Sequence, residues 1–170
     1  MDLQTITGYI ARYGLIAVFV IVLLEYMNLP GFPAGIIMPA AGIFAAKGGL
    51  NFIWVLLISM LAGLTGSWVL YFIGRLGGAP ALAWLKKKMP KQQERIDKII
   101  DWINRRGFIS VFISKLLPTV RTIISLPAGV VKMNFAVYTV SSAIGIAIWN
   151  FVFIGAGYLF GDTVFSLFGK

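Results

Sequence analysis

The sequence predicts an all-α membrane protein that contains inverted repeats of a re-entrant helix hairpin and a transmembrane helix, with a cytoplasmic amphipathic helix between them. Three observations support this prediction. The 170 residues are 59% hydrophobic and only 12% charged, whereas a soluble domain is about half apolar and about a quarter charged. Two long apolar runs each follow an apolar segment rich in proline and glycine. Several short motifs also occur twice in the same order. We expect a single domain, residues 1–170.

The first repeat is expected to begin with a transmembrane span at residues 6–27, since about 20 apolar residues cross a bilayer. The next segment, residues 28–46, remains apolar but contains Pro30, Pro33 and Pro39 and ends near Gly42. These prolines and glycines should break a continuous helix. An apolar segment is not expected to form a solvated loop, so a re-entrant hairpin fits both properties. Residues 51–74 then predict a second span, on which Gly63, Gly66 and Ser67 form a small face for close helix contact.

A basic region separates the two repeats. Residues 86–106 contain eight lysines and arginines against three acids. The positive-inside rule places this region in the cytoplasm. Isoleucines recur at helical spacing (Ile96, Ile99, Ile100 and Ile103) and predict an amphipathic helix on the membrane surface. The charge either attracts anionic lipid or only sets the topology, and the second interpretation is simpler. Nucleic-acid binding is not expected, because no aromatic platform lies among the charges.

The second repeat resembles the first. Residues 107–132 are apolar, contain Pro118, and end in Pro127-Ala128-Gly129, and residues 134–158 predict the last span. Pro39-Ala-Ala-Gly42 and Pro127-Ala-Gly129 each precede an Asn-Phe pair, and Trp-x-x-x-Phe-Ile-Gly occurs at residues 68–74 and 149–155. A shared order of several motifs favours a true repeat. With the basic region inside, one hairpin enters from outside and the other from the cytoplasm. Such inverted repeats place a substrate site near the midplane.

Three ionisable side chains lie in or beside the broken segments: Glu25, Lys115 and Arg121. A charge inside hydrocarbon costs roughly 2.5–3.5 kcal/mol on insertion scales and marks a functional site by default. A kink at Pro118 would let Lys115 and Arg121 point into one cavity, where they form a plausible phosphate clamp. Glu25 either pairs with one of these cations or exchanges a proton. The alternative is a buried ion pair that only fixes the hairpins, and we favour the functional interpretation.

Other residues are weaker candidates. Arg75 is interpreted mainly as a cytoplasmic anchor, and Asn150 is either a polar site residue or a hydrogen bond between helices. Trp102, with Trp54 and Trp84, is expected at the membrane interface. The chain has no cysteine and no histidine, so we expect no disulfide, no metal site and no cofactor. The residues expected to shape the hairpins are Pro30, Pro33, Pro39, Gly42, Pro118, Pro127 and Gly129.

These motifs resemble the DedA family of bacterial membrane proteins, part of the VTT-domain (SNARE-associated) superfamily. The most specific part is a string with fixed spacing that runs from Phe112 to Phe135. The matching residues are Glu25, Pro30, Pro33, Ala41-Gly42, Tyr71, Gly74, Arg75, Phe112, Lys115, Pro118, Arg121, Pro127-Ala128-Gly129, Met133 and Phe135. The resemblance implies opposed re-entrant hairpins and translocation of undecaprenyl phosphate, or of phospholipids such as phosphatidylethanolamine, between leaflets, with proton coupling. Two positions depart from the family pattern. The family usually has arginine at Lys115, and a second acid is common where this chain has Ala34-Gly35.

The resulting hypothesis is a lipid flippase in a bacterial or archaeal plasma membrane. Lys115 and Arg121 would bind the phosphate of a membrane phospholipid or polyprenyl phosphate, and Glu25 would balance charge or carry protons. One alternative is a proton-coupled exporter of small cations, which would use Glu25 but should not need two fixed positive charges. Another is a membrane assembly protein without transport, and a homo-oligomer is also left open. An enzyme is not expected, because the chain lacks histidine, cysteine and paired acids.

Overall fold

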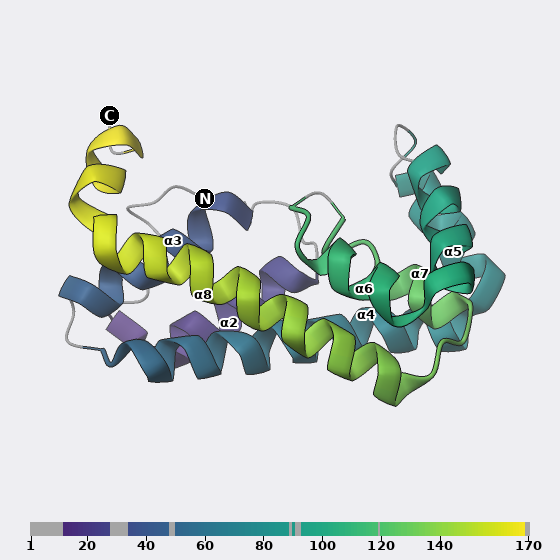
Figure 1. Cartoon of the computed structure of the whole chain (residues 1–170), viewed down its shortest axis with the longest axis horizontal. Helices are drawn as coiled ribbons and strands as arrows, with labels where there is room; N and C mark the ends of the chain where they lie inside the picture. Colours follow the sequence, from purple (N-terminus) through teal and green to yellow (C-terminus); the bar gives the residue numbers. More distant parts are fainter. Residues whose placement is uncertain are drawn as a thin grey trace. The chain divides into compact units, whose positions relative to one another are not determined.

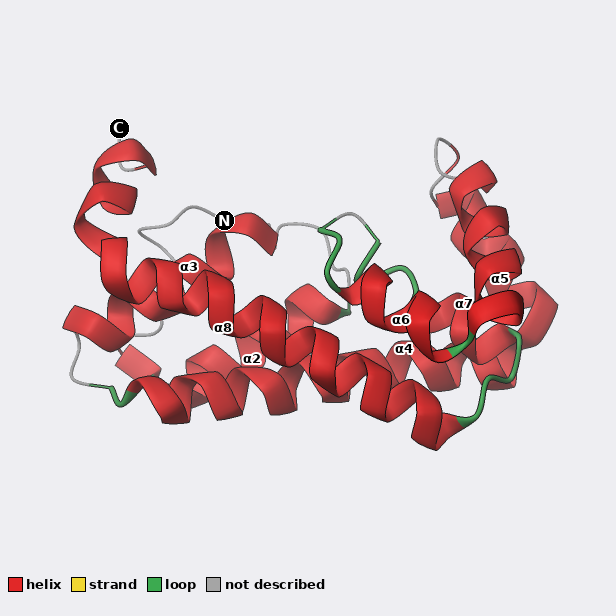
Figure 2. Cartoon of the chain, in the orientation of Figure 1, coloured by secondary structure: helices red, strands yellow, loops and turns green. Residues whose placement is uncertain are grey.

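A computed structural model describes residues 12–27, 34–47, 50–88, 90, 93–118 and 120–168 of the chain. Within these ranges every regular element is a helix, joined by turns and short coils (Figure 1, Figure 2). The predicted all-α class is therefore confirmed for this part of the chain. The helices are α2 (Leu15–Tyr26), α3 (Ala34–Lys47), α4 (Phe52–Lys88), α5 (Gln93–Arg106), α6 (Phe108–Lys115), α7 (Ser125–Val130) and α8 (Phe135–Phe168).

Among the described helices, α4 and α8 are long and apolar enough to cross a membrane, judged by length and composition. Each begins directly after an asparagine that caps it. The Oδ1 of Asn51 accepts the N–H of Ile53 at 2.8 Å, and the Oδ1 of Asn134 accepts the N–H of Ala136 at 2.9 Å. These bonds satisfy backbone donors that the first turn of a helix leaves unpaired. The repeated Asn-Phe pair therefore marks two helix starts, as the sequence predicts.

Both long helices change direction near their far ends. The backbone of α4 leaves helical angles at Gly78, with a φ of 52°, which a residue without a Cβ adopts cheaply. The backbone of α8 does so at Phe160. The lysines at residues 86–88 form the last turn of α4, and α5 begins at Gln93. The segment predicted over residues 86–106 therefore includes the end of α4 and the whole of α5.

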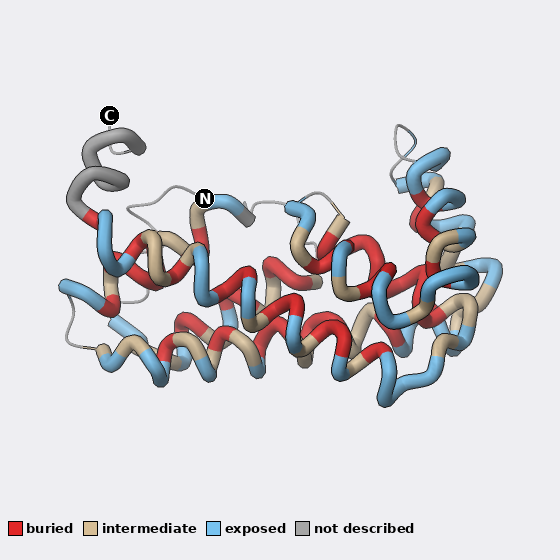
Figure 3. The backbone as a smooth tube through the Cα atoms, viewed as in Figure 1, coloured by how far each residue is buried: buried red, intermediate tan, exposed pale blue. Residues whose placement is uncertain are grey.

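Large apolar residues of α4 and α8 are exposed, and Figure 3 shows exposed positions recurring along both helices. Soluble monomers rarely expose extended apolar surfaces, and such surfaces mark contact with membranes or partners. In a membrane, the hydrocarbon chains of the lipids would contact these side chains and shield them from water. The exposed set includes Ile53, Trp54, Leu57 and Leu61 on α4, and Ile144, Ile148, Phe151, Val152 and Leu159 on α8.

Contacts divide the chain into two compact units. Unit 1 consists of Met1–Gly66 with Ile146–Lys170, and unit 2 consists of Ser67–Gly145. Each unit therefore contains one part of α4 and one part of α8, together with shorter helices of its own. Unit 1 contains α2 and α3, and unit 2 contains α5, α6 and α7.

In unit 1, α2 packs closely on the first part of α4. A Cβ built on Gly63 would lie 3.1 Å from the Tyr26 ring, and one built on Gly66 would lie 2.9 Å from the Tyr26 Cβ. Small residues allow helices to approach at this distance. The small face predicted at Gly63 and Gly66 is therefore confirmed as a packing surface.

Glycines also join the predicted hairpin of unit 1 to a long helix. A Cβ on Gly42 of α3 would overlap the carbonyl oxygen of Ile154 in α8. In return, a Cβ on Gly157 of α8 would overlap the carbonyl oxygen of Pro39 in α3. The backbones of the two helices are thus in direct contact, and only glycine fits at either position.

Unit 2 contains the same kind of contact. A Cβ on Gly129 of α7 would overlap the carbonyl oxygen of Tyr71 in α4, and one on Gly74 of α4 would overlap the carbonyl oxygen of Leu126 in α7. The glycine after the Pro-Ala motif therefore contacts a carbonyl of a long helix in both units. Each unit pairs one such glycine with a second glycine on the long helix.

These contacts correct one equivalence drawn from the sequence. The two Trp-x-x-x-Phe-Ile-Gly motifs pair Gly74 with Gly155, yet a Cβ on Gly155 would meet nothing within 4 Å. Gly157 is the residue that contacts the hairpin helix, as Gly74 does in unit 2. Gly74 and Gly157 also stand the same number of residues after Asn51 and Asn134. Gly74 and Gly157 therefore make matching contacts within their own units, whereas the sequence motif pairs Gly74 with Gly155.

The two predicted hairpins differ in how proline is accommodated. Pro39 lies inside α3, so the helix continues through it with the loss of one backbone hydrogen bond. In the second segment, α6 ends at Lys115, turns follow around Pro118, and α7 begins at Ser125. Pro127 lies in the first turn of α7, where its missing N–H has no helical partner to lose.

The amphipathic helix α5 lies against α6 and α7 (Figure 1). Its buried residues are Ile96, Ile99 and Ile103, and buried and exposed positions alternate along this helix in Figure 3. The sequence predicts that this apolar face lies on the membrane. Instead it packs inside unit 2 against residues such as Val111 and Ile124, because the short helices α6 and α7 leave an apolar surface that α5 covers.

Candidate functional site

Glu25 lies in the last turn of α2 and is only 2% exposed. The neighbouring Val22 and Tyr26 are also buried. A buried carboxylate is costly unless other groups stabilise it or it takes up a proton. Glu25 belongs to unit 1, whereas Lys115 and Arg121 belong to unit 2, so its pairing with either cation stays a prediction.

Lys115 is the last residue of α6 and is 1% exposed. Its Nζ donates to the Oγ of Ser67 at 2.8 Å and to the Oγ of Ser125 at 3.1 Å. The same atom lies 5.9 Å from the centre of the Tyr138 ring. The hydroxyls and the ring face stabilise an ammonium, but they are neutral. They hold the Lys115 ammonium in position.

Tyr138 and its neighbours hold the surroundings of Lys115 in place. The Tyr138 hydroxyl donates to the carbonyl oxygen of Ser67 at 3.1 Å, and its ring stacks on Tyr71 with centroids 4.6 Å apart. A Cβ on Gly145 would lie 2.5 Å from the Lys115 Cβ, so α8 passes directly beside the lysine stem. Residues of α4, α7 and α8 thus fix the Lys115 ammonium in one position.

Arg121 lies in the turns between α6 and α7, and its side chain is fully buried. Its backbone N–H donates to the carbonyl of Leu117 at 3.0 Å, which closes the turn around Pro118. The predicted break at Pro118 therefore occurs, and it places a buried cation on each side of the turn. A shared cavity for the two cations stays a prediction.

Asn150 forms part of a buried polar cluster in unit 1. Its Nδ2 donates to the Oγ of Ser59 at 3.0 Å, and its Oδ1 accepts the hydroxyl of Tyr26 at 3.2 Å. These bonds join α8 to α4 and α2. The hydrogen bond between helices, one of the two roles predicted for Asn150, is confirmed. Tyr26, which belongs to this cluster, directly follows Glu25 in the sequence.

Arg75 and Trp102 have structural roles that can be described directly. The Nη1 of Arg75 donates to the Tyr71 hydroxyl at 2.7 Å and to the Met133 carbonyl at 3.4 Å. Arg75 thus ties α4 to the turn before α8, and its role as a cytoplasmic anchor stays a prediction. Trp102, expected at the membrane interface, is half-buried and lines a cavity within unit 2.

The residues expected to shape the hairpins fall into three groups. Gly42 and Gly129 make the backbone contacts described above. Pro39, Pro118 and Pro127 lie in α3, in the turn after α6 and in α7. Pro30 and Pro33 lie outside the described residues. A role of these residues in shaping re-entrant hairpins stays a prediction.

Sequence reasoning missed several polar residues around the candidate site. Ser125 and Tyr138 contact Lys115, and Tyr26 and Ser59 contact Asn150. The sequence predicts only a packing role for the small side chain of Ser67, whereas its hydroxyl oxygen accepts a hydrogen bond from the Lys115 ammonium. The sequence contains one weak indication of a polar role for Ser67. It lies the same number of residues after Asn51 as Asn150 lies after Asn134.

A family model for the VTT domain matches residues 32–159, which is most of the chain. The chain belongs to the DedA family of VTT-domain proteins. The matched range contains Lys115, Arg121 and Asn150, whereas Glu25 lies just before it. Family membership, together with the apolar helices α4 and α8, identifies the chain as a membrane protein.

Named relatives cover nearly the whole chain. Undecaprenyl phosphate transporter A of Staphylococcus aureus is 36% identical, over 98% of this chain and 81% of that protein. The uncharacterized membrane protein YbfM of Bacillus subtilis is 31% identical, over 94% of this chain and 98% of that protein. Protein DedA of Escherichia coli is 25% identical, over 89% of this chain and 72% of that protein. No solved structure matches the chain.

Proposed function

We propose that this protein moves a phosphate-bearing lipid between the two leaflets of a bacterial membrane. The observation that carries the proposal is the pair of buried cations, Lys115 and Arg121, on the two sides of one turn in unit 2. An arginine and a lysine together suit a phosphate, because the guanidinium binds it in a planar fork and the ammonium as a point charge. A relative named as an undecaprenyl phosphate transporter supports a lipid phosphate as cargo.

The architecture we propose is a pair of inverted repeats with re-entrant hairpins. Matching glycine contacts support a repeat, since Gly42 and Gly129 each pack on a carbonyl of a long helix within their own unit. The basic residues of α5 and of the last turn of α4 support a cytoplasmic position for that region. Inverted repeats of this kind hold the transported group near the middle of the membrane.

Polyprenyl phosphate is the cargo that we favour, with phospholipids as the second choice. A phosphate monoester carries more negative charge than a phospholipid diester, and two fixed cations can balance that charge. The resemblance to the DedA family implies a second acid at a position where this chain has Ala34-Gly35, and the lack of that acid would leave the surroundings of the cations more positive. Transport of phosphatidylethanolamine would require the cations to tolerate a zwitterionic head group.

A liposome assay tests the proposal directly. Full-length protein is reconstituted with fluorescent polyprenyl phosphate or fluorescent phosphatidylethanolamine, and the fraction of label accessible to an external quencher is followed with time. We expect the protein to accelerate equilibration of polyprenyl phosphate between leaflets compared with empty liposomes. The proposal fails if correctly folded protein accelerates neither lipid.

Glu25 is proposed to couple transport to protons, because it is the buried acid of α2 and its carboxylate can be neutralised by protonation. Glu25→Gln keeps the shape of the side chain and removes its titration. In the same liposomes, a pH gradient should change the wild-type rate and leave the Glu25→Gln rate unchanged. If the gradient affects both proteins equally, protons do not act through Glu25.

A further inference from the structure

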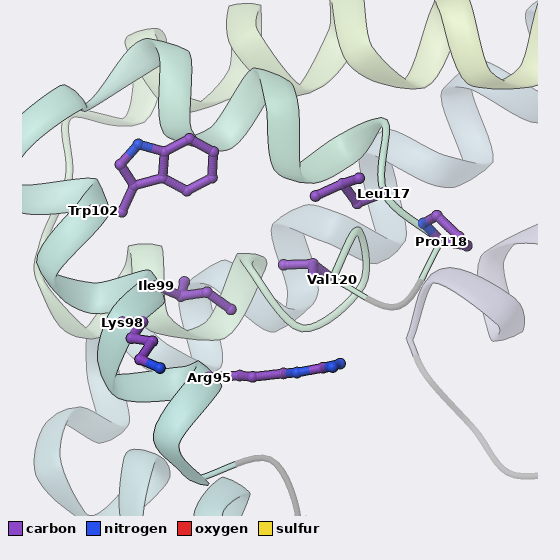
Figure 4. A pocket seen from close by; sticks show the side chains of 7 residues that line it. All are labelled: Arg95, Lys98, Ile99, Trp102, Leu117, Pro118 and Val120. Atoms are coloured by element: carbon purple, nitrogen blue, oxygen red, sulfur yellow. The ribbon is translucent and has the colours of Figure 1, made fainter.

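A cavity of about 520 Å³ lies within unit 2, between α5 and the turn that follows α6 (Figure 4). Five of its lining residues are apolar and two are basic. Figure 4 shows the Arg95 side chain extending from α5 toward the turn, with Lys98 beside it on the same helix. The lining residues are Arg95, Lys98, Ile99, Trp102, Leu117, Pro118 and Val120.

The two basic residues lie outside the buried face of α5. Arg95 and Lys98 are exposed, whereas Ile96, Ile99 and Ile103 form the buried face. Among the acids of this helix, Asp97 binds the Lys86 ammonium at 2.5 Å, and Glu94 and Asp101 are exposed. None of these three acids lines the cavity. Its charged side is therefore positive.

The remaining wall is suited to a hydrocarbon chain. Trp102 is half-buried, and Leu117 and Pro118 are exposed although they are apolar. An occupant that suits both walls carries a negative charge at one end and an apolar chain at the other. A second groove of about 500 Å³, in unit 1 between α4 and α8, is lined by apolar and aromatic residues such as Phe52 and Leu159 and by no charged side chain.

We propose that the α5 cavity binds a lipid phosphate monoester, with its phosphate between Arg95 and Lys98 and the start of its chain on Trp102 and Leu117. This inference rests on the proposed function and adds a second phosphate site to it. The Leu117 carbonyl that closes the turn accepts the N–H of Arg121, and Val120 lines the cavity. Val120 directly precedes the buried Arg121 in the sequence, and the proposal assigns to this cavity the entry or exit of the lipid phosphate.

The choice of a monoester follows from charge. A phosphate monoester carries about −1.5 to −2 at neutral pH and offers three acceptor oxygens, which match one guanidinium and one ammonium. A diester such as phosphatidylglycerol carries a single negative charge, and phosphatidylcholine carries none overall. The cavity should therefore prefer phosphatidic acid, a stable monoester probe, over either of these lipids.

Native mass spectrometry of the full-length protein in detergent tests this preference by titration with dioleoyl phosphatidic acid, phosphatidylglycerol or phosphatidylcholine. The Arg95→Ala/Lys98→Ala pair should weaken binding of phosphatidic acid about tenfold to thirtyfold, since each basic residue near a lipid surface is worth about 1 kcal/mol. The matched control is Arg105→Ala/Arg106→Ala, which removes two exposed charges from the last turn of the same helix. The affinity of this control variant for phosphatidic acid should stay within about twofold of the wild-type value, because salt screens exposed charges that lie far from the cavity.

Three results would overturn the assignment. The two double variants could lose affinity equally, the wild type could bind phosphatidic acid and phosphatidylglycerol equally, or inorganic phosphate alone could displace the lipid at equal concentration. Arg95→Gln/Lys98→Gln repeats the test with polar side chains if the alanine pair lowers thermal stability. If the protein translocates lipid but does not bind the monoester at the α5 cavity, this inference fails and the proposed function stands. If the cavity binds the monoester but the protein translocates no lipid, the proposed function fails and the binding site stands.

Discussion

Lys115→Met and Arg121→Met are each expected to abolish lipid translocation by the folded protein. Both residues are buried, and hydrogen bonds to Ser67 and Ser125 hold the Lys115 ammonium in position. Methionine keeps most of the apolar stem and removes the charge. The transported phosphate would then lose one of its two cations, whereas the packing would change little.

The expected loss of transport is large. Truncating one partner of a buried charged pair costs about 2–5 kcal/mol, which corresponds to a rate about thirtyfold to several thousandfold lower if the contact forms in the rate-limiting state. Initial rates in the liposome assay measure this loss. Lys115→Arg is the matched control, because the positive charge remains. Arg121→Lys should be intermediate, since an ammonium cannot form the two parallel bonds of a guanidinium.

Thermal stability separates a binding role of these cations from a structural one. Removing one member of a buried ion pair is strongly destabilising, by about 3–5 kcal/mol, because the other charge is left uncompensated. A binding role predicts that the loss of transport by both methionine variants is much larger than any loss of thermal stability in detergent. A lowered midpoint together with retained transport would assign these cations to a structural ion pair. Retained transport of a small cation by both variants would favour the exporter hypothesis instead.

The sequence predicts the fold well where local patterns determine structure. Asn51 and Asn134 mark the starts of α4 and α8, because an asparagine before an apolar run caps a helix without help from distant residues. The isoleucines of α5 reveal an amphipathic helix, but periodicity gives only the buried face and not what covers it. The surface beneath α5 is formed by residues of α6 and α7, which the helical period of α5 cannot indicate.

The candidate site was predicted less completely, for a similar reason. Lys115 and Arg121 could be found because charges in apolar segments are rare and costly. Their neutral partners could not be found in this way, since Ser67 is 48 residues from Lys115 and serine is common in helices that pack closely. Likewise, Tyr26 bonds Asn150 across 124 residues. Such pairs become visible only when the helices are packed together.

Gly157→Ala is expected to destabilise the protein strongly. A Cβ at this position would overlap the carbonyl oxygen of Pro39 and lie 2.8 Å from its Cα. Both are backbone atoms, so no side-chain rotation can relieve the overlap, and α3 and α8 would have to separate. Overpacking typically costs 1–3 kcal/mol and occasionally more, and we expect a value near the upper end. For a chain of this length that corresponds to a midpoint lower by about 5–10 °C.

Gly155→Ala is the matched control, since it lies two residues earlier on the same helix and its Cβ would meet nothing within 4 Å. Alanine stabilises a helix relative to glycine by about 1 kcal/mol, so this variant should unfold at the same or a higher temperature. Circular dichroism in detergent can follow both variants. The reciprocal change, Gly42→Ala, would overlap the Ile154 carbonyl and should resemble Gly157→Ala. Equal midpoints for Gly157→Ala and Gly155→Ala would contradict the direct backbone contact between α3 and α8, and with it the alignment of Gly157 with Gly74.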